Sequence, residues 1–153
     1  MRMTMLAAGL VLVGITLMAK PSRAGNLSRA TGRLLRSSSY IYVATQRKNG
    51  ELGSFSPIWF VYEDGKIFFS TSPDSWKAKR IAKGSPLTIR VGSVDGPTLI
   101  GKAKKVTDPA YIDKMGEVYS RKYWIAWLGF FRPRSERVTQ GKTMAYVVEA
   151  EEG

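Results

Sequence analysis

The clearest pattern of strands and turns lies between residues 55 and 81. Residues 56–62 are an apolar and aromatic run that as a strand would place Ile58, Phe60 and Tyr62 on one face, and residues 66–71 form a second run of β-forming residues. Asp64 and Gly65 lie between them and tolerate the positive φ angles that a two-residue hairpin loop requires. The pattern therefore predicts a β-hairpin whose first strand is continuous over residues 56–62.

The rest of the chain predicts more short strands and a few helices. One helix is expected from Asp74 or Ser75 to about Lys83, and another after Asp108, where Pro109 takes the first helical position. Short strands joined by turns, with few helices, are typical of an all-β or α+β barrel. Further strands are predicted at residues 40–46, 87–91, 98–106 and 143–149.

Residues 123–131 are the most aromatic part of the chain and allow three interpretations. They could belong to the core or to a dimer interface, form an apolar wall over a bound ligand, or contact a bilayer. Arg132 and Arg134 follow at once and could reach a phosphate group or simply face solvent. The sequence leaves these alternatives open.

Composition restricts the chemistry. A chain of 153 residues is long enough for one domain with a sizeable core. It contains no histidine and no cysteine, which excludes histidine-based triads, histidine or thiolate metal sites and disulfides. Catalysis would have to come from a cofactor, or from carboxylate, lysine or tyrosine side chains, and no metal site is predicted.

The formal net charge of +12 is unevenly distributed. Residues 1–36 contain six basic residues and no acidic one, so they hold half of the excess. No nucleic-acid-reading motif and no dense Lys/Arg block is present, and we expect no nucleic-acid partner. Affinity for a phosphate-bearing ligand or anionic lipid fits this charge better.

The N-terminal residues 5–19 are an uncharged apolar run. Its 15 residues suit a signal-peptide core better than a full membrane span, but the basic residues after it favour retention of that side in the cytoplasm. We expect membrane association through residues 1–24 with the domain on the cytoplasmic face; the alternatives are export after cleavage, or a cytoplasmic protein with a later start. Residues 25–39 are expected to be a basic linker or a short amphipathic helix, and residues 40–150 the barrel domain.

Hydroxyl and basic side chains gather after the predicted hairpin. Ser70, Thr71 and Ser75 surround the end of a strand and the start of a helix, where free backbone N–H groups favour anions. Lys77 adds a positive charge. These residues fit two interpretations equally well, a phosphate site and a capped helix with a solvated basic face.

An ordered set of short motifs over residues 40–92 resembles the pyridoxamine 5'-phosphate oxidase-like family of FMN- and F420-binding split barrels. No single motif is specific, but their order over about fifty residues is. The matching segments are Ala44-Thr45, Asn49-Gly50, residues 56–60 (SPIWF), residues 64–71 (DGKIFFST), residues 75–77 (SWK) and residues 87–91 (LTIRV).

The resemblance implies a mainly β fold, a split barrel of about six strands with two or three helices, that forms a homodimer. It implies an oxidoreductase that uses FMN, or alternatively F420, to transfer hydride or electrons to a small-molecule substrate. A non-catalytic barrel that holds a cofactor or another anionic ligand is the alternative, and no catalytic residue can be named. The implied cofactor-binding residues are Ser56, Pro57, Ile58, Trp59, Ser70, Thr71, Ser75, Trp76 and Lys77.

Three positions depart from the vitamin B6 oxidases of this family. Phe55 and Trp76 stand where those enzymes carry arginine, and Phe60 stands where they carry lysine. The loss of three cationic contacts argues against pyridoxamine 5'-phosphate oxidase activity itself.

Overall fold

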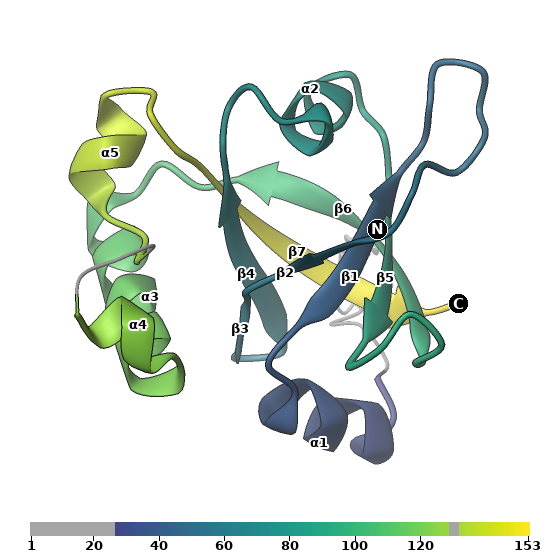
Figure 1. Ribbon diagram of the computed structural model, residues 1–153, viewed down its shortest axis with the longest axis horizontal. Coiled ribbons are helices and arrows are strands. Elements are labelled where there is room, and N and C mark those ends of the chain that lie inside the picture. The colour runs from purple at the N-terminus through teal and green to yellow at the C-terminus, as the bar shows by residue number, and fades with distance from the viewer. Residues whose placement is uncertain (1–26, 129–131) are drawn as a thin grey trace, which may run out of the picture.

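Seven antiparallel strands form one strongly curled sheet in the computed structural model, which describes residues 27–128 and 132–153 (Figure 1). The strand order is β2-β1-β5-β6-β7-β4-β3. The mainly β split-barrel fold that the sequence predicted is thereby confirmed. The strands are β1 (Ile41–Thr45), β2 (Ser56–Ile58), β3 (Val61–Glu63), β4 (Lys66–Thr71), β5 (Leu87–Val91), β6 (Thr98–Lys105) and β7 (Met144–Glu152).

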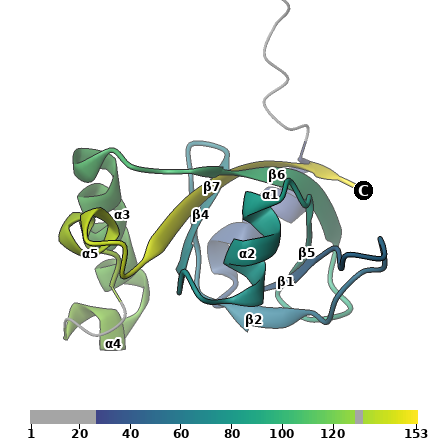
Figure 2. The same ribbon diagram turned by 90° about the horizontal axis from the view of Figure 1, so that it is seen from above.

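The helices lie at the two ends of the curled sheet and along one side of it. α1 (Arg29–Ser37) and α2 (Trp76–Ala82) lie at opposite ends in Figure 1. α3 (Pro109–Lys122), α4 (Trp124–Trp127) and α5 (Ser135–Thr139) gather on the side next to β4 and β7, which Figure 2 shows from a second direction. The chain leaves the sheet after β6, forms these three helices, and returns to the sheet at β7.

The strand predicted over residues 56–62 is interrupted, so that prediction was wrong. β2 pairs with β1 at one edge of the sheet, and β3 pairs with β4 at the other edge. The curl of the sheet brings the two edges together, and Trp59 and Phe60 connect them. Alternation along a sequence cannot reveal such a break, because both halves keep strand geometry.

The predicted turn after β3 is confirmed. Asp64 has φ 50° and Gly65 has φ 74°, the left-handed conformation that a two-residue hairpin loop needs at both positions. Glu63 and Lys66 pair directly across the turn. The register of β3 and β4 is thus fixed by the turn itself.

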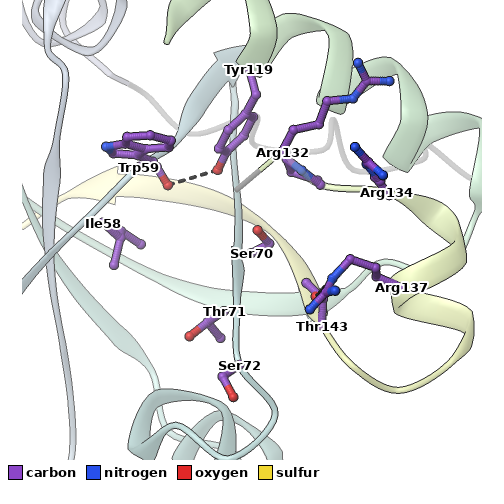
Figure 3. A pocket seen from close by; sticks show the side chains of 11 residues that line it. Ile58, Trp59, Ser70, Thr71, Ser72, Tyr119, Arg132, Arg134, Arg137 and Thr143 are labelled. Atoms are coloured by element: carbon purple, nitrogen blue, oxygen red, sulfur yellow. Dashed lines mark hydrogen bonds between the residues drawn. The ribbon is translucent and has the colours of Figure 1, made fainter. Parts of the chain in front are cut away.

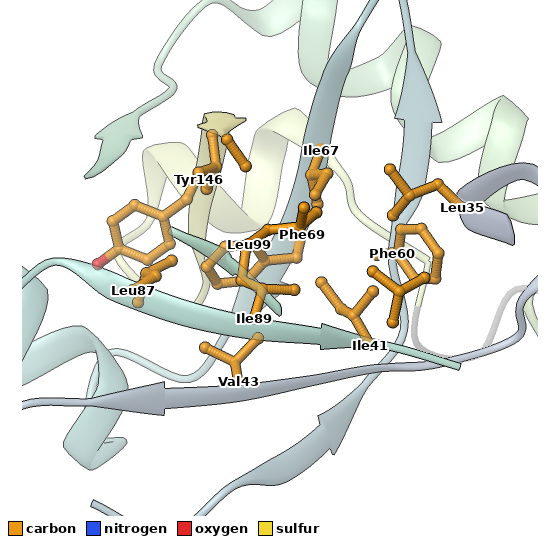
Figure 4. Close-up of a cluster of buried hydrophobic side chains, with 13 residues drawn as sticks. Leu35, Ile41, Val43, Phe60, Ile67, Phe69, Leu87, Ile89, Leu99 and Tyr146 are labelled. Carbon is orange, nitrogen blue, oxygen red and sulfur yellow. The ribbon is translucent and has the colours of Figure 1, made fainter. Parts of the chain in front are cut away.

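The curled sheet encloses one apolar core, shown in Figure 4. Phe60, Phe69 and Tyr146 are its aromatic members, and Leu35 of α1 is fully buried against it. A second cluster lies between α3 and the outer face of the sheet. It contains Ile112, Met115 and Tyr119 of α3, packed on Val61, Phe68 and Ala145.

The C-terminal strand is longer than predicted. β7 continues to Glu152, whose carboxylate accepts hydrogen bonds from Ser28 N (3.0 Å) and Thr31 Oγ1 (2.6 Å) at the start of α1. The sequence pattern predicted the end of this strand at residue 149. Pairing with β6 and this contact with α1 hold the segment in the sheet instead.

The prediction of a membrane anchor is corrected. Among residues 27–128 and 132–153, no helix has the length and apolar character needed to cross a bilayer. The apolar run 5–19 on which the prediction depended lies outside the described residues. In the described part of residues 25–39, α1 is a short helix packed on the barrel rather than a linker.

Candidate functional site

A cavity of about 700 Å³ lies between the end of β4 and the helices α3 and α5 (Figure 3). Its volume is in the range of small-molecule sites, about 300–1,000 Å³. One wall comes from the barrel and the other from the segment between α3 and β7. The lining residues are Ile58, Trp59, Ser70, Thr71, Ser72, Tyr119, Arg132, Pro133, Arg134, Arg137 and Thr143.

The end of β4 supplies the hydroxyl groups of the cavity. Ser70, Thr71 and Ser72 follow one another where the strand ends before Pro73. Thr71 Oγ1 donates a hydrogen bond to Ser75 Oγ (3.1 Å), which also accepts one from Ala78 N (3.1 Å) as the N-cap of α2. The cap therefore connects the edge of the cavity to the first turn of α2.

Trp59 and Tyr119 form the aromatic wall. The Trp59 ring stacks on Tyr123, with a centroid distance of 4.4 Å and an interplanar angle of 6°. Tyr119 Oη donates a hydrogen bond to the Trp59 carbonyl (2.9 Å). Burial raises the pKa of Tyr119 well above its usual range, so this phenol stays protonated and acts as a donor.

Three arginines give the opposite wall a positive charge (Figure 3). Arg137 Nε reaches Thr143 Oγ1 at 3.4 Å, whereas the buried Nε of Arg132 has no hydrogen-bond partner. No carboxylate is among the lining residues. A wall with Arg132, Arg134 and Arg137 and no acid attracts an anionic ligand.

Two contacts place this arginine segment against α3. Asp113 accepts hydrogen bonds from Ser135 N (2.9 Å) and Ser135 Oγ (2.8 Å), and these bonds lower the pKa of its carboxyl group. Gly116 lies so close to Pro133 that an added Cβ would be 2.4 Å from the Pro133 carbonyl oxygen. A larger residue at 116 would push the segment away from the helix.

Lys77 lies on α2 beside β2. Its Nζ donates a hydrogen bond to Ser56 Oγ (2.7 Å), and burial lowers its pKa. No carboxylate lies within ion-pair distance of it in the described part of the chain. The lysine therefore contributes positive charge that no acid of the described chain neutralises.

Residues 27–153 match the family model of pyridoxamine 5'-phosphate oxidase. The chain belongs to this family. No curated protein matches the sequence.

Solved structures of the same fold have low sequence identity to this member of the pyridoxamine 5'-phosphate oxidase family. An F420 reductase is 18% identical, with a TM-score of 0.55 over 81% of this chain and 95% of its own. An FAD-binding protein from Mesorhizobium loti is 14% identical, with a TM-score of 0.57 over 82% and 91%. General stress protein 26 from Bacillus anthracis is 15% identical, with a TM-score of 0.55 over 78% and 84%. At these identities the likenesses establish the fold alone.

The predicted site residues of this family member fall into three groups. Ile58, Trp59, Ser70 and Thr71 line the cavity, and Ser75 is one hydrogen bond away from it. Ser56 and Lys77 form a bonded pair next to β2. Pro57 and Trp76 are exposed; the Trp76 side chain is 71% accessible, and Lys79 and Arg80 each lie 5.4 Å from the centre of its ring.

Several lining residues were missed by the sequence prediction. Tyr119 was not among the predicted site residues, although it lines the cavity. Arg137 and Thr143 gave no signal, because they reach the cavity only through long-range contacts: α5 packs on α3, and Met144, next to Thr143, pairs with Thr71 of β4. Of the alternatives for residues 123–131, the core interpretation holds for Tyr123, which is buried. Trp124 is 73% exposed, and residues 129–131 lie outside the described chain.

Proposed function

We propose that this chain is an oxidoreductase that binds FMN, or alternatively coenzyme F420, at the cavity and the adjoining start of α2. The family supports this proposal, as do solved structures of the same fold that are called an F420 reductase and an FAD-binding protein. When bound, such a cofactor supplies the hydride or electron transfer, and the protein supplies binding and orientation.

The donor set of the site fits an anionic cofactor. Ser70, Thr71 and the first turn of α2 offer hydroxyl and backbone donors for a phosphate group, and Lys77 offers the nearest unneutralised ammonium group on α2. Arg134 and Arg137 add guanidinium groups on the opposite wall. This continuous set of donors is the observation that carries the proposal.

The barrel wall would position the cofactor ring. Trp59 is held by its stack on Tyr123 and by the Tyr119 hydrogen bond to its carbonyl, so it is a rigid apolar surface beside Ile58. We assign Ser56, Pro57 and Trp76 to the outer edge of the same site. A rigid first layer of contacts is what orientation of a reactive ring requires.

Vitamin B6 oxidation is not part of the proposal. Phe60, which stands where the vitamin B6 oxidases carry lysine, is completely buried in the barrel core. Phe55 lies under the Arg90 guanidinium, with the Arg90 Cζ 4.6 Å from its ring centroid. Neither side chain can replace a cationic contact to a phosphorylated substrate, so we propose a different small-molecule substrate.

Replacement of Lys77 tests the phosphate assignment. We expect Lys77→Ala to weaken FMN or F420 binding by about 10- to 100-fold, because a charge-assisted hydrogen bond contributes about 1.5–3 kcal/mol. Lys83→Ala is the matched control, since Lys83 is exposed at the end of the same helix. Titration of each purified variant with FMN and with F420 gives the affinities, and equal affinities for the two variants would exclude Lys77 from the site.

Turnover separates the enzyme from a non-catalytic carrier. The wild-type protein with reduced cofactor should reduce at least one member of a panel of quinone and enone acceptors, whereas a carrier would leave all of them unchanged.

We also propose that two copies form a homodimer with a cleft between them, which sedimentation analysis would show as twice the mass of the 17.0 kDa chain.

A further inference from the structure

A second groove, which the proposed function does not use, follows the exposed side of α1. It has a volume of about 380 Å³ and lies between α1 and Tyr62 of β3. We propose that this groove binds a small polyanion, that is, a ligand with at least two phosphate or carboxylate groups. We call it the α1 groove; its lining residues are Leu27, Ser28, Arg29, Gly32, Arg33, Arg36 and Tyr62.

Three arginines supply the charge of the α1 groove. Arg29, Arg33 and Arg36 are spaced as i, i+4 and i+7, so they share one side of the helix, and all three are exposed. Within the described chain, none has a carboxylate at ion-pair distance. Three like charges on two helical turns repel one another, and a bound anion would relieve that repulsion.

The acidic residues nearest to the groove do not neutralise it. The Glu152 carboxylate accepts hydrogen bonds from Ser28 and Thr31 at the start of α1, and these bonds lower its pKa, so it stays ionised; it makes no ion pair with an arginine of the described chain. Glu63 follows Tyr62 on β3 and therefore points to the opposite face of the strand, where it acts on Tyr111. The guanidinium groups of the row can therefore bind an anionic ligand.

One end of the arginine row is held against the barrel, and a glycine leaves space in its middle. The Arg36 guanidinium lies 5.3 Å from the centre of the Tyr62 ring, which holds one end of the row against the barrel. Gly32 lies in the middle, and an added Cβ would already be 3.4 Å from an Arg36 nitrogen. A longer side chain at position 32 would fill the space that the guanidinium groups share.

α1 itself is firmly anchored, and the row of arginines is separate from the cavity at β4. Leu35, on the buried side of α1, is completely enclosed by the barrel core, and Thr31 is tied to Glu152. α1 lies at the end of the sheet opposite to α2, which carries Lys77 (Figure 1). Planar guanidinium groups on such a fixed helix can bind phosphate or carboxylate oxygens in pairs.

Calorimetric titration of the full chain with inorganic pyrophosphate tests this proposal. We expect binding that weakens at least about tenfold in the double variant Arg33→Gln/Arg36→Gln, because two charge-assisted contacts are lost. Glutamine is a good helix former, so α1 should keep its structure. The control Arg47→Gln/Lys48→Gln removes the same charge from the exposed β1–β2 loop and should bind as the wild type does.

A third variant separates the α1 groove from the larger cavity. Arg132→Gln/Arg137→Gln should keep the part of the pyrophosphate binding that depends on Arg33 and Arg36, whatever the larger cavity itself binds. Loss of binding in this variant alone, or equal weakening in the Arg47/Lys48 control, would overturn the proposal, as would a wild-type protein that does not bind pyrophosphate. Citrate binding with the same dependence on Arg33 and Arg36 would support it and extend the ligand class to carboxylates.

Discussion

At the scale of single residues, two lysines approach the segment that connects β2 and β3 without a carboxylate partner among the described residues. Lys77 Nζ donates to Ser56 Oγ, and Lys122 Nζ donates to the Phe60 carbonyl (3.0 Å). Burial lowers the pKa of both, that of Lys122 to about 8. The first lysine faces the proposed phosphate site, whereas the second contacts the barrel core at Phe60.

The pKa of Lys122 predicts how stability depends on pH. Its folded-state pKa is below the usual value of 10.5, so the unfolded chain binds more protons between pH 8 and 10.5 and the free energy of unfolding rises over that interval. We expect the wild type to gain roughly 1 kcal/mol relative to Lys122→Met between these pH values, after allowance for partial exposure. Chemical denaturation at several pH values measures the difference.

The Phe60 ring opposes the effect of burial on the pKa of Lys122. The ammonium nitrogen lies 3.5 Å from the ring centroid, a contact that favours the charged form. If the stability difference between wild type and Lys122→Met does not change from pH 8 to 10.5, the ring compensates for burial and the prediction is wrong. Lys114→Met, on an exposed position of α3, is the control.

At the scale of elements, Tyr123 joins the end of α3 to the break between β2 and β3. Its hydroxyl oxygen accepts a hydrogen bond from Phe60 N (3.1 Å) and lies 2.9 Å from the Ser39 carbonyl oxygen. The ring stacks on Trp59 of the cavity wall. One side chain thus satisfies backbone groups that strand pairing leaves free where the chain crosses from one sheet edge to the other.

Removal of this hydroxyl group should destabilise the fold. Tyr123→Phe leaves the buried Phe60 N–H without its partner, so we expect a loss of about 1–3 kcal/mol in the free energy of unfolding. Tyr40→Phe, at a partly exposed tyrosine just before β1, should have little effect. Urea denaturation of both variants provides the test, and equal stabilities would mean that water or another group satisfies Phe60 N.

The sequence predicted helix starts and turns well where residues close together in the chain determine them. Ser75 and Asp108 cap helices as their residue types indicate, and Asp64-Gly65 forms the expected turn. The break at Trp59 and Phe60 could not be predicted from the same patterns, since it follows from the curl of the whole sheet. Pairing of β7 with β6 up to Glu152 is likewise a long-range effect.

At the scale of the whole molecule, one wall of the site could be predicted from the sequence and the other could not. The barrel wall with Trp59, Ser70 and Thr71 was predictable, because those residues lie in neighbouring short motifs that resemble the family. The arginine wall comes from residues more than sixty positions later and reaches the cavity only after α3 and α5 have packed beside β4. Sequence spacing contains no information about that approach.

The central claim of this account is that the barrel holds a flavin or deazaflavin cofactor. The most direct test is the absorption spectrum of the wild-type protein purified from its own host, with mass identification of any small molecule released on denaturation. The account predicts either the visible bands of a flavin or the single blue-shifted band of a deazaflavin, with a released mass that matches FMN or F420. A colourless protein that also fails to take up either compound on titration would contradict it.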